Sequence, residues 1–208
     1  FGDPTKTIPN LDEALAILGD QPSRLKADSY LIRGSSHITN GQPDLAFADY
    51  KEGIALIDRL YGPDHPVVAK IKLETSAAMA ALNRKDDSLR LAMEAEVIMN
   101  RHPSPDSDDL AQMKLNLGAA YANAKDYRTS RKYLTEARAI TLTIKGPAHP
   151  DLALIDSNIA EVYVSEKDFA TAMKLGREAL ALMERTTPKP HEDRGNLLRV
   201  ISDAAGGL

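Results

Sequence analysis

The stretch that decides the fold is Leu-Asn-Leu-Gly-Ala-Ala-Tyr at residues 115–121, which recurs in altered form along the chain. Its central Gly118 lies 42 residues after Ser76 and 42 before Ala160, and Gly34 precedes Ser76 by the same distance. Two further series with this spacing also hold only small residues: Ala46, Ser88, Ser130 and Ala172, and Gly53, Ala95, Ala137 and Ala179. A fixed period of this length predicts stacked helical units, because short side chains are needed where helices cross closely.

Each predicted unit consists of a first helix, a short turn, a longer second helix and a loop that contains proline. First helices are expected at 24–39, 66–82, 108–124 and 150–165, and second helices at 44–60, 86–101, 128–145 and 170–185. The loop Gly-Pro-Asp-His-Pro at 62–66 matches Gly-Pro-Ala-His-Pro at 146–150, and Ser23 and Ser107 hold the position of His65 and His149. Since serine is a strong helix N-cap, these four residues are predicted to cap the first helices.

The two ends of the chain depart from the repeat. Residues 10–20 predict a short amphipathic helix with Leu11, Ala14, Leu15 and Leu18 on one face, and Asn10 with Glu13 resembles a capping box. Residues 192–205 place Leu197, Leu198 and Ile201 on one face, predicted to pack on the last second helix. A helical stack needs such covers at its ends. We therefore expect an N-terminal capping helix at 1–21, four units at about 22–62, 63–104, 105–146 and 147–187, and a C-terminal capping helix and tail at 188–208.

Composition excludes several classes of protein. The 208 residues are 43% hydrophobic but only 5% aromatic, which favours an Ala- and Leu-rich helical core. The net charge of −4 argues against nucleic acid as a partner. The sequence contains no apolar run of about 18 residues, so membrane insertion is not predicted. The absence of cysteine excludes disulfides and thiolate chemistry. The chain starts at Phe1, which suggests a processed protein or a fragment, and the compartment, cytoplasmic or periplasmic, stays open.

The residues at the fixed positions resemble a known family. The third unit combines Leu115–Tyr121 with Asp126-Tyr127, and the fourth combines Asn158–Tyr163 with Asp168-Phe169. This pattern resembles the tetratricopeptide repeat, in the 42-residue variety of kinesin light chains and many bacterial proteins, which shares the Gly-Pro-x-His-Pro loop. The resemblance covers about residues 22–187 and implies an all-α, right-handed solenoid of four units with helical caps. The first two units depart from it, since His37 and Met79 stand where the pattern has Tyr.

Catalytic and metal-binding chemistry is not indicated. His65 and His149 are read as helix caps and His37 as a packed core residue, while His102 and His191 have no partner at ligand spacing. The acidic run 106–109 lacks the glycine and distant glutamate of a calcium loop, and is explained by the dipole of a helix start. We predict no catalytic residue, no metal and no cofactor. A basic set on one second helix is read as a solvated face: Arg128, Arg131, Lys132 and Arg138.

What remains is a binding surface. The resemblance implies that the first helices line a concave face, with one row through Ile32, Glu74, Asn116 and Asn158. In the family, Asn at the last two positions hydrogen-bonds the main chain of an extended peptide, which an amide can do by donating and accepting at once. Alternatively, these amides only bond within their own helices. The predicted groove residues are Lys70, Glu74, Gln112, Asn116, Asn123, Asn158 and Glu161.

The resulting hypothesis is a non-enzymatic scaffold that binds another protein or an extended peptide, as part of a larger bacterial protein or assembly. The alternative is a sensor module that responds to a peptide or small ligand and controls an attached catalytic or DNA-binding domain. A third interpretation, an enzyme, requires a buried titratable cluster. The sequence leaves open the partner, the oligomeric state, and whether the concave or the convex face binds.

Overall fold

The computed structural model describes residues 4–102, 107–186 and 192–207, which form α-helices and no strand. The helices are α1 (Pro4–Leu18), α2 (Arg24–Thr39), α3 (Pro43–Tyr61), α4 (Pro66–Ala81), α5 (Lys85–Arg101), α6 (Asp108–Asn123), α7 (Tyr127–Lys145), α8 (Pro150–Ser165), α9 (Phe169–Thr186) and α10 (Glu192–Gly207). The predicted helices of all four repeats are confirmed to within about one residue at each end.

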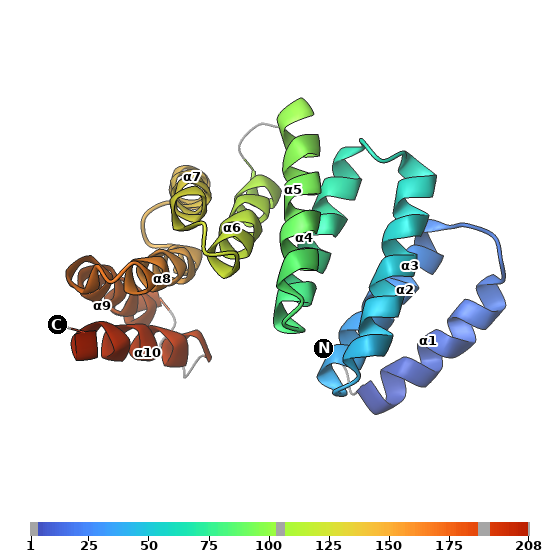
Figure 1. Cartoon of the computed structure of the whole chain (residues 1–208), viewed down its shortest axis with the longest axis horizontal. Helices are drawn as coiled ribbons and strands as arrows, with labels where there is room; N and C mark the ends of the chain where they lie inside the picture. Colours follow the sequence, from blue (N-terminus) through green and yellow to red (C-terminus); the bar gives the residue numbers. More distant parts are fainter. Residues whose placement is uncertain (1–3, 103–106, 187–191, 208) are drawn as a thin grey trace. The chain divides into compact units, whose positions relative to one another are not determined.

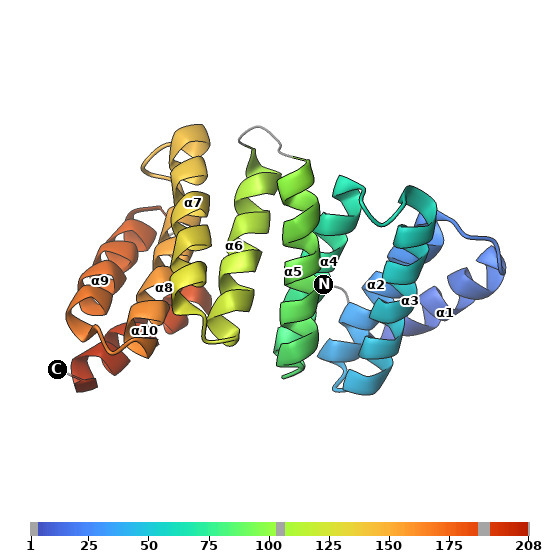
Figure 2. The same cartoon turned by 45° about the horizontal axis from the view of Figure 1, so that its top comes forward.

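The chain divides into two compact units, one up to residue 103 and one from residue 104 onward. In the first unit, α2 pairs with α3 and α4 with α5 as antiparallel hairpins, α3 packs on α4, and α1 packs on α2 (Figures 1 and 2). In the second unit, α6 pairs with α7 and α8 with α9, α7 packs on α8, and α10 packs on both α9 and α8. Each unit is therefore two helical hairpins and one additional helix.

The starts of the first helices confirm the predicted caps. Ser23 and Ser107 accept at Oγ from the backbone N–H three residues on, at 3.1 and 3.2 Å. His65 and His149 accept at Nδ1 from the backbone N–H two residues on, at 3.2 and 3.3 Å. These bonds satisfy donors that have no partner inside the helix, so both histidines have a structural role.

The turns inside the four hairpins share one backbone geometry. The second residue after each first helix adopts positive φ, between 57° and 70°, at four positions 42 residues apart: Gly41, Asn83, Lys125 and Lys167. Only glycine adopts this region without strain, and lysine is not favoured there. Because the turn is the same with three residue types, the packing of the paired helices imposes it.

All twelve small residues of the repeat series are buried. At Gly118, a Cβ atom would lie only 2.6 Å from Cγ of Leu134, and at Gly34 it would lie 3.3 Å from the ring of Tyr50. Leu134 and Tyr50 each stand 16 residues after the glycine that they cover. Where the first helix instead carries Ser76, the residue 16 positions on is the smaller Ala92. At the two glycine crossings the bulk is therefore contributed by the second helix, whereas Ser76 with Ala92 and Ala160 with Gly176 combine two small residues.

Two predictions about the ends were wrong in detail. Helix α1 begins at Pro4 and includes Pro9, so Asn10 lies inside the helix and cannot cap it. Proline in a helix removes one backbone hydrogen bond, which made residue 10 look like a start.

The face of α10 also differs from the prediction. Leu197 is fully buried as predicted, but Leu198 is 48% exposed and Val200 is buried in its stead, together with Ala204. Helix α10 packs on α8 as well as on α9: Leu197 joins Leu152 and Ala153 of α8 in one apolar cluster, while Val200 lies over Gly176 of α9.

Candidate functional site

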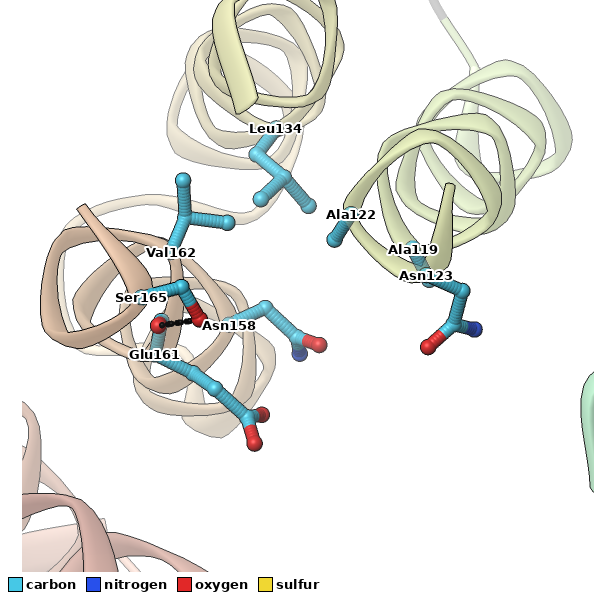
Figure 3. Close-up of a pocket in the computed structure, with 8 residues that line it drawn as sticks. All are labelled: Ala119, Ala122, Asn123, Leu134, Asn158, Glu161, Val162 and Ser165. Atoms are coloured by element: carbon cyan, nitrogen blue, oxygen red, sulfur yellow. Dashed lines mark hydrogen bonds between the residues drawn. The ribbon is translucent and has the colours of Figure 1, made fainter. Parts of the chain in front are cut away.

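The second unit contains a pocket of about 240 Å³ between α6, α7 and α8. Its lining is Ala119, Ala122, Asn123, Leu134, Asn158, Glu161, Val162 and Ser165 (Figure 3). Leu134 and Val162 provide an apolar wall, while the amides of Asn123 and Asn158 and the carboxylate of Glu161 point toward the same open side. The structure thus brings together three of the predicted groove residues.

The two repeat-related asparagines use part of their hydrogen-bonding capacity within their own helices. Asn158 donates from Nδ2 to the carbonyl of Leu154 at 2.9 Å, and Asn116 accepts at Oδ1 from Nε2 of Gln112 at 2.9 Å. Within the described part of the chain, Oδ1 of Asn158 and Nδ2 of Asn116 make no hydrogen bond. One amide is therefore left as an acceptor and the other as a donor.

A second pocket of about 240 Å³ lies near the starts of α6 and α8. Its lining is Asp108, Asp109, Ala111, Gln112, Leu115, Thr141, Lys145, Asp151, Leu154 and Ile155. Lys145 contacts Asp151 at 2.8 Å and Asp108 at 3.1 Å, and the hydrogen bond to Asp151 raises the pKa of this lysine. With three carboxylates and one ammonium, this pocket is acidic. Helices α6 and α8 thus contribute to both pockets. On α6, Gln112 lines one pocket and Ala119 the other, and Asn116 lies between these two residues in the sequence.

Helix α10 adds a residue that the sequence reasoning missed. Arg199 donates from Nη2 to Glu161 at 2.8 Å and from Nη1 to Asp203 at 3.3 Å. The hydrogen bond to Glu161 raises the pKa of Arg199 and fixes a cation beside the first pocket. No sequence signal could have found it, since α10 lies outside the repeat.

The remaining predicted residues lie in the first unit. Lys70 and Glu74 are exposed on α4, four residues apart and therefore on one helix face. The predicted row is thus divided: Ile32 and Glu74 belong to the first unit, whereas Asn116 and Asn158 belong to the second.

The basic set on α7 is not a uniformly solvated face, and that prediction was wrong for two members. Arg138 donates to both carboxylate oxygens of Asp156, at 2.6 and 3.2 Å, and Arg131 is hydrogen-bonded to Glu166. Both partners belong to α8 or the turn after it. Arg131 and Arg138 therefore tie α7 to the following hairpin.

The first unit contains a partly exposed group of charged side chains around the buried Lys72, which the sequence did not reveal. Nζ of Lys72 lies 2.9 Å from Glu94 and 3.8 Å from Asp58, and Lys72 is only 7% exposed. Burial raises the pKa of Asp58, whose Oδ1 is buried and accepts no hydrogen bond in the described structure. Burial also opposes ionisation of Glu94, but the hydrogen bonds and positive charges of Lys72 and Arg90 together outweigh it and lower the pKa of Glu94.

Metal coordination finds no support in the geometry of the described residues, where no three His, Asp or Glu side chains are placed to hold an ion. His37 is buried, with Nδ1 at 2.8 Å from Oε1 of Gln42 and Nε2 at 3.6 Å from Asp49. It therefore joins α2 to α3, as the sequence predicted for a packed residue. None of the described helices is long and apolar enough to cross a membrane.

Comparison with solved structures shows the same architecture in other proteins. BtubC (BKLC) from P. vanneervenii aligns over 100% of this chain and 85% of its own, with 16% identity and a TM-score of 0.77. A putative kinesin light chain of Podosopora anserina with nearly identical TPR-like repeats aligns over 90% and 88%, with 18% identity and a TM-score of 0.72. Pseudomonas aeruginosa pilF aligns over 95% and 78%, with 17% identity and a TM-score of 0.56. At these identities the likeness concerns the fold.

Stacked helical hairpins with open, polar-rimmed pockets define a class of protein–protein interaction scaffolds, which are generally non-catalytic. Tetratricopeptide repeat family models match residues 27–67 and 109–185. The chain belongs to the tetratricopeptide repeat family, whose members bind other proteins or peptides. No curated protein matches the chain.

Proposed function

We propose that this protein is a non-enzymatic scaffold, within a larger bacterial protein or assembly, that holds an extended segment of a partner protein against α6 and α8. The observation that carries the proposal is the pair of asparagines beside the two pockets. Asn158 retains a carbonyl acceptor and Asn116 retains an amide donor. Together they can bind one acceptor and one donor of a peptide main chain without selecting a side chain.

The spacing of the helices supports an extended ligand. Packed helices lie about 8–10 Å apart, and an extended chain rises about 3.3 Å per residue, so the two amides would hold groups about three residues apart. Each pocket, at about 240 Å³, exceeds the roughly 150 Å³ cavity that accommodates benzene, so each has room for one large side chain.

The charges of these pockets favour a neutral or basic segment. Asp108 and Asp151 surround the single ammonium of Lys145, and Glu161 is paired with Arg199. No group of cations is available in the two pockets to clamp the carboxylate at a chain terminus.

The test begins with a peptide selected from a random display library for binding to the protein. This peptide is titrated by calorimetry into the parent, into the double variant Asn116→Ala with Asn158→Ala, and into Asn100→Ala. Asn100 is an exposed amide on α5 and serves as the matched control. Each lost hydrogen bond costs about 0.5–1.5 kcal/mol, so the double variant should bind about tenfold more weakly or worse.

Circular dichroism establishes that the helical content of all three proteins is the same. Equal affinity of the parent and the double variant would contradict the proposal and favour the alternative that these amides serve only their own helices. A loss of affinity in Asn100→Ala would move the binding site to the first unit.

A further inference from the structure

A pocket of different character lies in the first unit, between α3, α4 and α5. It has a volume of about 290 Å³ and is lined by Phe47, Tyr50, Lys51, Ile54, Asp58, Lys72, Thr75, Met79, Arg90, Leu91 and Glu94. The partly exposed Phe47 and Ile54 supply accessible apolar surface above the buried Met79 and Leu91, and five of the lining side chains are charged. An apolar surface with a few polar groups is the usual form of a small-molecule site.

The repeat itself explains why this pocket is open. Positions 84 residues later in the second unit hold Tyr163 in place of Met79 and Arg138 in place of Ile54. The Tyr163 ring lies 5.3 Å from the guanidinium of Arg131, and Arg138 bonds to Asp156 across the same helices. An aromatic ring and a guanidinium therefore occupy the second-unit counterpart of the pocket. Methionine and isoleucine leave that space empty in the first unit.

The cations that line the pocket differ in their pairing. Lys72 and Arg90 both bond to Glu94, at 2.9 and 3.1 Å, and Asp58 lies 3.8 Å from Lys72. Lys51 is exposed and forms no ion pair within the described part of the chain. Arg90 is also paired with Asp87 at 3.1 Å, so Lys51 is the one lining cation without a carboxylate partner in the described structure.

We propose that this pocket binds a small aryl or branched-alkyl carboxylate, with the apolar group against Phe47 and Ile54, above the buried Met79, and the carboxylate at the ammonium of Lys51. The volume supports the size, since a cavity of roughly 150 Å³ accommodates benzene and this pocket is nearly twice as large. The site involves other helices than the proposed peptide surface on α6 and α8, so either proposal can fail without the other.

The experiment follows backbone amide resonances of the ¹⁵N-labelled full chain during titration with indole-3-propionate. Its primary amide and tryptamine are matched probes of neutral and positive charge. The acid should give saturable shifts confined to α3, α4 and α5, with a Kd on the order of 1 mM for a ligand of this size. The amide should bind several-fold more weakly and the amine most weakly. A lack of saturable shifts with the acid, or equal binding of the amine, would overturn the proposal.

Two variants locate the site. Met79→Tyr introduces the residue that the fourth repeat carries and should abolish the shifts, whereas Tyr163→Met makes the reciprocal change in the second unit and should leave them unchanged. Because Met79 is fully buried, Lys51→Gln at an exposed position provides the test that does not depend on repacking. Lys51→Gln should bind the acid and its amide equally. Retention of the acid preference in Lys51→Gln, or tight binding by a folded Met79→Tyr, would refute the assignment.

Discussion

Replacement of Gly118 by alanine tests the helix crossing on which the repeat depends. Alanine is favoured over glycine inside a helix by about 0.8–1 kcal/mol, so an unopposed substitution would stabilise the protein. At Gly118, however, the new Cβ would lie 2.6 Å from Cγ of Leu134, whereas carbon atoms prefer about 3.5–4.0 Å. Leu134 is fully buried and must move by about 1 Å within a packed core, which costs about 1–3 kcal/mol. The net expectation is a destabilisation of about 0–2 kcal/mol.

Gly195→Ala on α10 is the matched control, because a Cβ there meets nothing within 4 Å. Urea unfolding followed by circular dichroism should place Gly118→Ala below the parent and Gly195→Ala above it. In a Leu134→Ala background the obstacle is gone, so Gly118→Ala should then stabilise by about 0.5–1 kcal/mol. Equal midpoints for Gly118→Ala and Gly195→Ala, or the same effect in both backgrounds, would show that Gly118 is not at the crossing.

Two further predictions concern the capping helix and the charged group around Lys72. Leu197→Ala should reduce the free energy of unfolding by about 2–5 kcal/mol and lower the thermal midpoint, since the Leu197 side chain is fully buried. Leu198→Ala should change the free energy of unfolding by no more than about 0.5 kcal/mol, since Leu198 is 48% exposed. Equal effects of the two substitutions would refute the placement of α10. Glu94→Gln should destabilise the protein at neutral pH, because Lys72 and Arg90 together lower the pKa of Glu94 against the opposing effect of burial, and this stabilisation is present above the ordinary pKa of a glutamate. Urea midpoints should converge with the parent as the pH falls through the folded-state pKa of Glu94, and Glu52→Gln at an exposed position is the matched control.

Much of the fold could be predicted because its determinants recur at a fixed spacing. Gly34, Ser76, Gly118 and Ala160 lie on successive first helices, and the short side chain needed at each crossing is visible in the sequence alone. The caps at Ser107 and His149 were also predictable, since capping depends on residues two or three positions away. Leu198 was misplaced because α10 lies outside the repeat, and its buried face depends on the position of α8.

The candidate site was less predictable because it depends on contacts between distant residues. Asn158 and Asn123 were found from their repeat positions, whereas Arg199 reaches Glu161 from 38 residues away. The local sequence around Arg138 does not indicate that its partner is Asp156. Met79 was recognised as a departure from the repeat, but the cavity that this departure opens could be seen only in the packed structure.

The complementary sizes of the two residues at a glycine crossing determine where repeats of this kind can be joined to make chimeras. A whole hairpin contains both residues of its crossing, so Gly118 and Leu134 stay paired when α6 and α7 are transferred together. A junction within a hairpin separates them: pairing α8 with α7 would bring Ala160 against Leu134, and pairing α6 with α9 would leave Gly118 without a large partner. Chimeras of this protein should therefore be joined in the loops between hairpins, because each transferred hairpin then keeps both residues of its crossing.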